Sequence, residues 1–239
     1  MWNTDTKGIF MTYKTELHLH SAEGSACATA TAEDIVKVYL EAGYTTVVLT
    51  NHFSPHTFKN LGPMTPEEKV EYYIDAYHAL KKAADGKLHV LFGMELLRTC
   101  DYLIYGMTEE FLRAHTDLMD TSLLISAPII REAGMILAQA HPFRNDMKVT
   151  DPTTLDGFEA YNAHTAPFRN KIADQWADEF GLIKTAGSDY HRDTHKAESG
   201  IITDFPITSN EELLATLRSG NYKLLNKGEI IELNNKKAE

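Results

Sequence analysis

The chain has 239 residues, of which 43% are hydrophobic and 24% are charged, and its formal net charge at pH 7 is −11. Single α/β barrels reach about 200–250 residues, so this length fits one domain with a sizeable core. The negative charge argues against a nucleic-acid or membrane surface, because both require clustered Lys and Arg. No apolar run approaches the about 18 residues of a membrane span, and the chain begins without the pattern of a secretory signal. We therefore expect a soluble, cytoplasmic protein that binds neither membranes nor, stably, nucleic acid.

Strand-like and helix-like segments alternate along the chain. The first strand, residues 13–20, leads through a loop to Thr31, where Thr31 and Asp34 form a capping-box pattern at the start of a helix. A second helix begins at Thr65 and Pro66, again a cap followed by proline. The expected strands are residues 13–20, 45–50, 88–92, 102–105, 135–139, 158–161 and 182–186. The expected helices are residues 31–42, 65–85, 120–133, 167–180 and 209–219.

This alternation predicts βαβ units around a parallel sheet. About seven units favour a closed, irregular α/β barrel over an open doubly wound sheet. The open sheet is the alternative, but the first strand is not followed by the glycine-rich phosphate loop of a dinucleotide fold. The chain shows no internal repeat, no low-complexity linker and no shift in composition. We therefore expect residues 1–239 to form a single domain.

Histidines and acids gather where the expected strands end. His18 and His20 are spaced i and i+2, so on a strand both would point to the same face. Since the C-terminal ends of barrel strands share one face, residues at those positions are expected to meet in one site. The candidate residues are His18, His20, His52, Glu95, Asp101, His141, Asp189 and His191.

This ordered set resembles the polymerase and histidinol phosphatase (PHP) superfamily. The matching motifs are His18-Leu19-His20, Thr50-Asn51-His52, Gly93-Met94-Glu95, His141-Pro142 and Ser188-Asp189-Tyr190-His191. The resemblance implies a distorted, TIM-like (β/α)7 barrel with three clustered metal ions. It also implies a phosphoesterase, of which histidinol phosphatase is one example.

The resemblance also implies which residues bind the first two ions. His18 and His20 would bind the first, with Asp189 completing it and Glu95 bridging to the second. His141 would bind the second ion, where Asp101 occupies the place of a histidine found in many relatives.

His52 and His191 would bind the third ion. Relatives add a ligand from the loop after the first histidine pair, and Glu23 is preferred to Cys27 because the neighbouring ligands are imidazoles and hard oxygens. Zinc, manganese and iron all suit this ligand set. Asn51 replaces the aspartate usual in the family, which lowers the expected affinity at this third position.

The expected reaction is attack of metal-activated hydroxide on the phosphorus of a small phosphomonoester. Arg144 and Arg192 are placed to hold phosphate oxygens, and His164 is a candidate to protonate the leaving group. Two alternatives stay open. One is a metal-dependent hydrolase of a C–N or other ester bond, and the other is a catalytically silent metal-binding regulatory module, which Asn51 favours.

Overall fold

A mixed sheet runs through the molecule. The computed structural model describes residues 11–234. The strands are β1 (Tyr13–Leu19), β2 (Tyr44–Leu49), β3 (His52–Phe53), β4 (His89–Leu97), β5 (Asp101–Tyr105), β6 (Ile136–Gln139), β7 (Gly157–Asn162), β8 (Ile183–Gly187), β9 (Gly200–Thr203), β10 (Lys223–Asn226) and β11 (Glu229–Ile231). Their order is β11-β10-β9-β1-β2-β4-β5-β6-β7-β8, with β3 paired to β4 beside this path.

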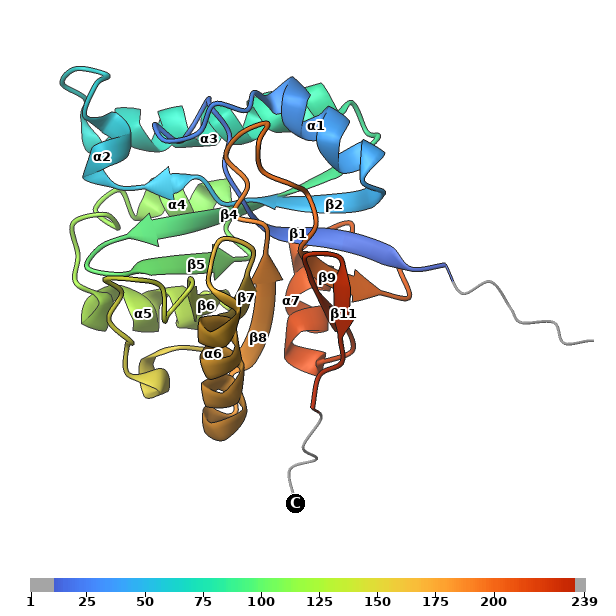
Figure 1. The fold of residues 1–239 in the computed structure, drawn as a ribbon. Coiled ribbons are helices and arrows are strands. Elements are labelled where there is room, and N and C mark those ends of the chain that lie inside the picture. The colour runs from blue at the N-terminus through green and yellow to red at the C-terminus, as the bar shows by residue number, and fades with distance from the viewer. Residues whose placement is uncertain (1–10, 235–239) are drawn as a thin grey trace, which may run out of the picture.

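The helices flank this sheet (Figure 1). They are α1 (Ala32–Glu41), α2 (Pro55–Phe58), α3 (Pro66–Ala84), α4 (Glu109–Ala114), α5 (Leu123–Glu132), α6 (Pro167–Phe180) and α7 (Asn210–Ser219), with a 3-10 turn, η1, at Pro152–Thr154. The predicted capping box of Thr31 and Asp34 is present at α1, and Thr65 forms another with Glu68 at α3. None of the helices in the described part of the chain is long and apolar enough to cross a membrane.

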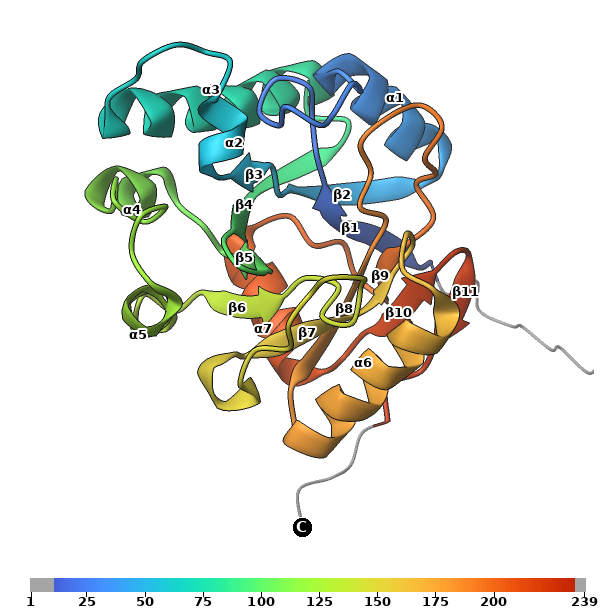
Figure 2. The same cartoon turned by 60° about the vertical axis from the view of Figure 1, so that its left-hand side comes forward.

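The predicted closed barrel of parallel strands is wrong in two respects. First, β5 runs antiparallel to both β4 and β6. Residues 98–100 are too few for the crossover that a parallel strand requires, so the chain can return only as a hairpin. Second, the sheet curls into a half-barrel and does not close (Figure 2). Within residues 11–234, the segment that follows the end strand β8 meets β1 through the isolated bridge between Leu19 and Tyr190.

The C-terminal part of the chain adds strands that were not predicted. β9 pairs antiparallel with β1, and β10 and β11 continue this meander. Helix α7 packs inside the curl, where Leu213 and Leu217 join a buried cluster that includes Leu17 of β1, Tyr105 of β5 and Ala186 of β8. This core holds the strands together and leaves their carboxyl ends to form the site.

Candidate metal centre

His18 and His20 lie at the carboxyl end of β1 and are fully buried. The pleat of the strand sends both imidazoles to one side, while Leu17 and Leu19, on either side of His18, are buried in apolar clusters. Their Nε2 atoms are 3.1 Å apart. Hydrogen bonds of the other ring nitrogens, the Nδ1 atoms, hold the two buried imidazoles in this arrangement.

The other ring nitrogen of each histidine is occupied by an acceptor. The Nδ1 of His18 is 2.8 Å from Oε1 of Glu159, so it donates to that carboxylate. The Nδ1 of His20 is 3.3 Å from Oγ of Ser25, whose own proton goes to Oδ1 of Asn51. In neutral rings both Nε2 atoms therefore carry lone pairs that face each other. A cation placed against both lone pairs would relieve this repulsion.

Two carboxylates reach the same point. Oε2 of Glu95, from β4, lies 3.3 Å from the Nε2 of His18, 3.2 Å from that of His20 and 3.0 Å from Nδ1 of His52. Oδ1 of Asp189 lies 3.4 Å from Nε2 of His18 and 3.5 Å from Nε2 of His20. The other oxygen of Glu95 is 3.2 Å from Nε2 of His141.

These contacts leave buried polar atoms without hydrogen bonds. Among the described residues, Oε2 of Glu95 and Nδ1 of His52 have no hydrogen-bond partner, although they are only 3.0 Å apart. An unpaired buried polar atom costs about 1–3 kcal/mol, so such atoms rarely gather without a ligand. The converging imidazole and carboxylate donors fit zinc, manganese or iron. The residues present therefore fit a metal centre.

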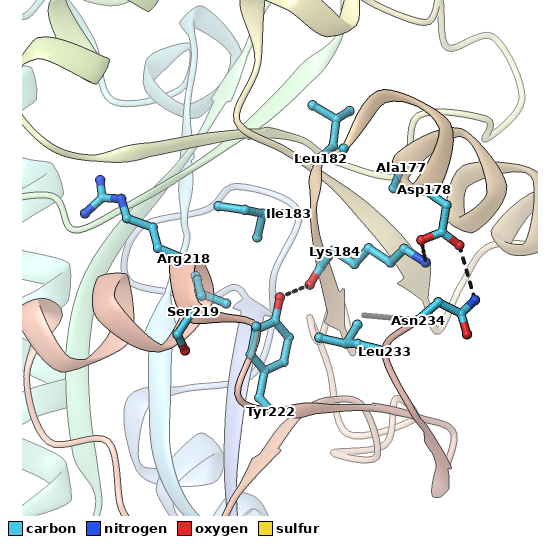
Figure 3. Close-up of a pocket in the computed structure, with 13 residues that line it drawn as sticks. Ala177, Asp178, Leu182, Ile183, Lys184, Arg218, Ser219, Tyr222, Leu233 and Asn234 are labelled. Atoms are coloured by element: carbon cyan, nitrogen blue, oxygen red, sulfur yellow. Dashed lines mark hydrogen bonds and ion pairs between the residues drawn. The ribbon is translucent and has the colours of Figure 1, made fainter. Parts of the chain in front are cut away.

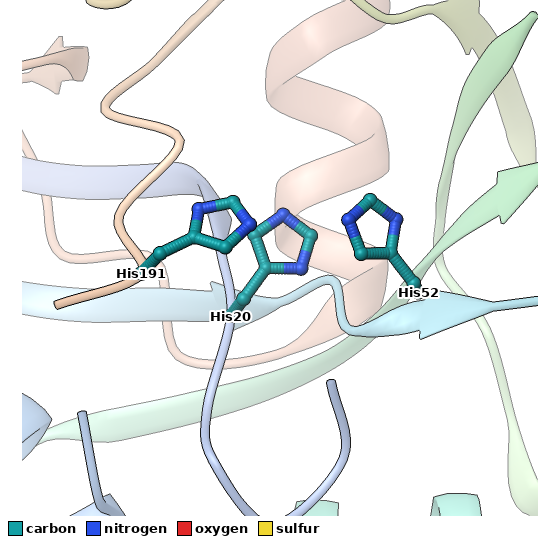
Figure 4. Close-up of side chains that lie close together, drawn as sticks. All are labelled: His20, His52 and His191. Carbon is teal, nitrogen blue, oxygen red and sulfur yellow. The ribbon is translucent and has the colours of Figure 1, made fainter. Parts of the chain in front are cut away.

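Three groups of residues bring ligand atoms within 4.8 Å of one another. They are His18, His20 and Asp189; His18, Glu95 and His141; and His20, His52 and His191. Figure 4 shows the last group, with rings that come from the residue after β1, from β3 and from the loop after β8. The ring of His20 lies between the other two, with centroid distances of 4.4 Å to His52 and 4.1 Å to His191.

The charges of the group also favour a cation. Burial alone would raise the pKa values of Glu95 and Asp189, but neighbouring histidines, above all His18, hold both well below their usual range. Burial and nearby imidazoles lower the pKa of His20 and bring that of His191 to about 3. At neutral pH, Glu95 and Asp189 are thus ionised and His20 and His191 are unprotonated, the forms that bind metals.

His18 differs from these two histidines. Burial would lower its pKa, but Glu159, Glu95 and Asp189 raise it well above the usual value. Without an ion, a proton on His18 partly neutralises the carboxylates. We therefore expect metal binding to release a proton.

Two of the predicted metal ligands belong to none of the three groups. Asp101 is buried, with Oδ2 3.7 Å from Nε2 of His141, and burial raises its pKa to about 6. Glu23 accepts a hydrogen bond of 2.9 Å from the backbone N–H of Ala32 at the start of α1. Its second oxygen, Oε2, is buried without a hydrogen-bond partner in the described chain. Cys27, the alternative to Glu23, is an exposed free thiol.

The three predicted catalytic residues occupy different environments. Nη2 of Arg144 is 2.6 Å from Oδ2 of Asp189 and 2.6 Å from Oδ1 of Asn162. Arg192 is exposed. His164 is also exposed, and its ring contacts that of His195 at a centroid distance of 4.0 Å. Partial burial and His195 lower the pKa of His164, which disfavours the proton-donating form near neutral pH.

The sequence analysis missed the residues that hold the ligands. Glu159 contacts His18, Ser25 contacts His20, and Asn162 contacts Asp189. Glu159 could have been noticed, because it is an acid between the apolar residues Phe158 and Ala160 of a strand that is buried except at Tyr161. Ser25 carries no comparable signal, since a serine in a loop is ordinary.

Asn51 acts on the centre through Ser25. Its Oδ1 accepts hydrogen bonds from the backbone N–H of Ser21 at 2.8 Å and from Oγ of Ser25 at 3.0 Å. Its Nδ2 donates to Oγ of Ser21 at 3.2 Å. The amide thus uses both its oxygen and its nitrogen here, and it supports the side chain that orients His20.

A separate cavity of about 310 Å³ lies near the beginning of β8, whereas Asp189 follows the end of that strand (Figure 3). The ammonium of Lys184 on its wall is 2.7 Å from carboxylates of both Asp174 and Asp178. Tyr222 donates its hydroxyl proton to the carbonyl of Lys184 at 2.7 Å. Because these groups are already paired, the cavity offers less chemistry than the histidine cluster.

Comparison with known proteins connects this site to a family. The model of the PHP-associated family matches residues 167–222, a segment that includes Asp189 and His191. No curated protein sequence matches the chain significantly.

Three solved structures share the fold. A two-domain protein of Bacteroides vulgatus, containing a predicted PHP-like metal-dependent phosphoesterase, aligns with a TM-score of 0.69 and 13% identity over 92% of this chain and 66% of its own. PsfC of Pseudomonas syringae aligns with a TM-score of 0.63 and 12% identity over 85% and 88% of the two chains. An amidohydrolase of Chromobacterium violaceum, with bound sulfate and no metal, aligns with a TM-score of 0.55 and 14% identity over 85% of this chain and 96% of its own. One segment of the chain thus resembles the PHP-associated family, and the fold is shared with a protein that contains a predicted PHP-like metal-dependent phosphoesterase.

Proposed function

We propose that this chain is a metal-dependent phosphoesterase that hydrolyses a small phosphomonoester. The observation that carries the proposal is the convergence of two Nε2 lone pairs, from His18 and His20, on oxygens of Glu95 and Asp189. The Bacteroides vulgatus neighbour, which contains a predicted PHP-like metal-dependent phosphoesterase, supports the same reaction class.

We further propose that the centre binds three metal ions. His18 and His20 each belong to two of the three groups, but each has one free nitrogen and can bind one ion. If both bind the first ion with Asp189, the second keeps Glu95 and His141 and needs Asp101. The third keeps His52 and His191 and needs Glu23, whose buried Oε2 has no hydrogen-bond partner in the described chain.

The residues around the ions prepare the centre for phosphate. Bound ions of this kind polarise a phosphoryl group and make a nearby water more acidic. Arg144 forms an ion pair with Asp189 and holds it in place. Although burial would lower the pKa of Arg144, this ion pair keeps the pKa raised, so the guanidinium is a permanent cation at the edge of the centre. It is placed to stabilise charge on the non-bridging oxygens. Arg192 and His164 are exposed and would contact the substrate from outside.

A second candidate is hydrolysis of a C–N bond. The observation that favours it is the fold shared with an amidohydrolase of Chromobacterium violaceum. The same metal centre would serve both reactions, because an acidified water can attack carbon or phosphorus. Arg144 beside the centre favours an anionic substrate and therefore the phosphoester.

The test compares p-nitrophenyl phosphate with p-nitroacetanilide, using protein loaded with manganese or zinc. We expect metal-dependent release of phosphate and no cleavage of the anilide. His18→Ala should lower both metal content and rate, the rate by at least about 100-fold, because the ions contribute several kcal/mol to such reactions. His89→Ala, at an exposed position that begins β4, is the matched control and should change neither. Cleavage of the anilide alone would replace the proposal by the second candidate, and a metal-loaded protein inactive on both would refute both.

A further inference from the structure

Glu159 is a buried acid in β7 that none of the ligand groups contains. Both of its oxygens accept hydrogen bonds. Oε1 is 2.8 Å from Nδ1 of His18. Oε2 is 2.9 Å from the backbone nitrogen of His141 and 3.0 Å from Nδ2 of Asn162. One carboxylate therefore contacts segments that begin in β1, β6 and β7.

Asn162 extends this contact to a fourth segment. Its Nδ2 also lies 3.3 Å from Oδ2 of Asp189, the oxygen that faces away from His18 and His20. Its Oδ1 accepts from Arg144 at 2.6 Å and from the backbone N–H of His164 at 2.8 Å. Since those two groups can only donate, the orientation of the amide is determined. Asn162 is fully buried, so these bonds have little competition from water.

We propose that Glu159 is a positioning residue that sets three metal ligands at once. It fixes the tautomer of His18, places the backbone of His141 and, through Asn162, orients Asp189. A carboxylate that accepts the second N–H of a ligand histidine fixes the ring and makes its free nitrogen more basic. The inference rests on the metal centre proposed above and adds to it the residue that preorganises the ligands.

The surroundings of Glu159 support this role. Its strand neighbours Phe158 and Ala160 are buried and apolar, and burying a carboxylate among such residues costs several kcal/mol unless it is fully hydrogen-bonded. Gly187 of β8 leaves the space for it: a Cβ at this position would lie 2.7 Å from Oε1 of Glu159 and would clash with Cβ of His18. Three strands thus accommodate one contact between a carboxylate and an imidazole.

The test variant is Glu159→Gln, which keeps the size and replaces one acceptor oxygen by a donor NH2. The NH2 group of the glutamine would face a donor in either orientation. It would lie against the N–H of His18 in one orientation and against the N–H groups of His141 and Asn162 in the other. Titration of metal-free protein with Zn²⁺ by calorimetry should show binding about 10- to 100-fold weaker than in the wild type. Asp174→Asn is the matched control, because Asp174 pairs with Lys184 away from the centre, and its affinity should equal that of the wild type.

A second measurement needs no substitution and does not depend on the variant folding. Long-range ¹H–¹⁵N spectra of the imidazoles should show the proton of His18 on Nδ1 in the Zn²⁺-loaded wild type. A loaded protein with no proton on this nitrogen would overturn the inference. So would a folded Glu159→Gln with wild-type Zn²⁺ affinity, which would leave the proposed function intact. A wild type that binds no Zn²⁺ would refute the metal centre and the inference together.

Discussion

Glu16 of β1 and Glu159 of β7 are two buried glutamates, and each accepts hydrogen bonds from both backbone and side-chain groups. Oε1 of Glu16 accepts from the backbone N–H groups of Leu17, His18 and Ser188, and Oε2 accepts from the hydroxyl of Tyr39. Glu16 therefore joins the end of β1 to the segment that carries Asp189. Both carboxylates thus support His18 and the segment that carries Asp189.

The charge of Glu16 gives a testable dependence of stability on pH. Burial raises its pKa from 4.5 to about 7, although the hydrogen bonds from Ser188, His18 and Tyr39 lower it. Between these values the folded chain binds more protons than the unfolded chain, so the free energy of unfolding falls as pH rises. The loss is complete above about pH 7 and amounts to about 3 kcal/mol.

Glu16→Gln should remove this contribution, because its amide oxygen can accept the three N–H groups and its NH2 can donate to Tyr39. We expect urea unfolding of metal-free protein to show the wild type losing stability relative to the variant from pH 4.5 to 7. A difference between the two proteins that stays constant across this range would contradict the assignment.

At the scale of elements, the site depends on how closely β8 approaches β1. Gly187→Ala should displace His18, since the added Cβ clashes with its Cβ and crowds Glu159. Overpacking of this kind costs about 1–3 kcal/mol of stability. We expect, in addition, metal binding weakened by at least about 10-fold, as for other changes that misorient a ligand.

Gly157→Ala separates the two effects. Its Cβ would lie 2.7 Å from the carbonyl oxygen of Ile183, at the beginning of β7 and β8 and so far from their ligand-bearing ends. This variant should lose a similar amount of stability but keep wild-type metal affinity. Thermal unfolding and metal titration of both variants check this. Equal losses of affinity would mean that Gly187 has no local role.

The elements that the sequence predicted well are those with local signals. Capping boxes indicate the starts of helices α1 and α3, and a run of β-branched residues indicates β2. The hairpin between β4 and β5 was not predicted, because the alternation of strands and helices along the chain indicates parallel strands. β9, β10 and β11 are three or four residues long, and the pairing of β9 with β1 joins segments that are distant in sequence.

The same distinction applies to the site. Histidines and acids at strand ends can be located by spacing, and the structure brings His18, His20, His52, Glu95, His141, Asp189 and His191 together. The contacts that orient them cannot be located in this way. Glu159 reaches His18 across 141 positions of sequence, and no local pattern encodes that distance.

For the whole molecule, metal binding is expected to contribute to folding as well as to catalysis. The ligands come from segments that span residues 18–191, so an ion bound to them joins β1 to the segment after β8, which β1 meets in the described chain at the Leu19–Tyr190 bridge. A ligand that binds only the folded chain at 100 times its dissociation constant adds about 2.7 kcal/mol. For a chain of this size, that raises the melting temperature by about 5–10 °C.

The most direct test of the account is to determine how many metal ions the reconstituted chain binds, by elemental analysis, and to measure its melting temperature before and after a chelator removes them. The account predicts about three ions per chain and a melting temperature that falls by at least about 5 °C on chelation. Two ions would mean that His18 and His20 serve different ions and would revise the assignment of ligands. No bound metal after reconstitution with zinc, manganese or iron, and no change on chelation, would contradict the metal centre itself.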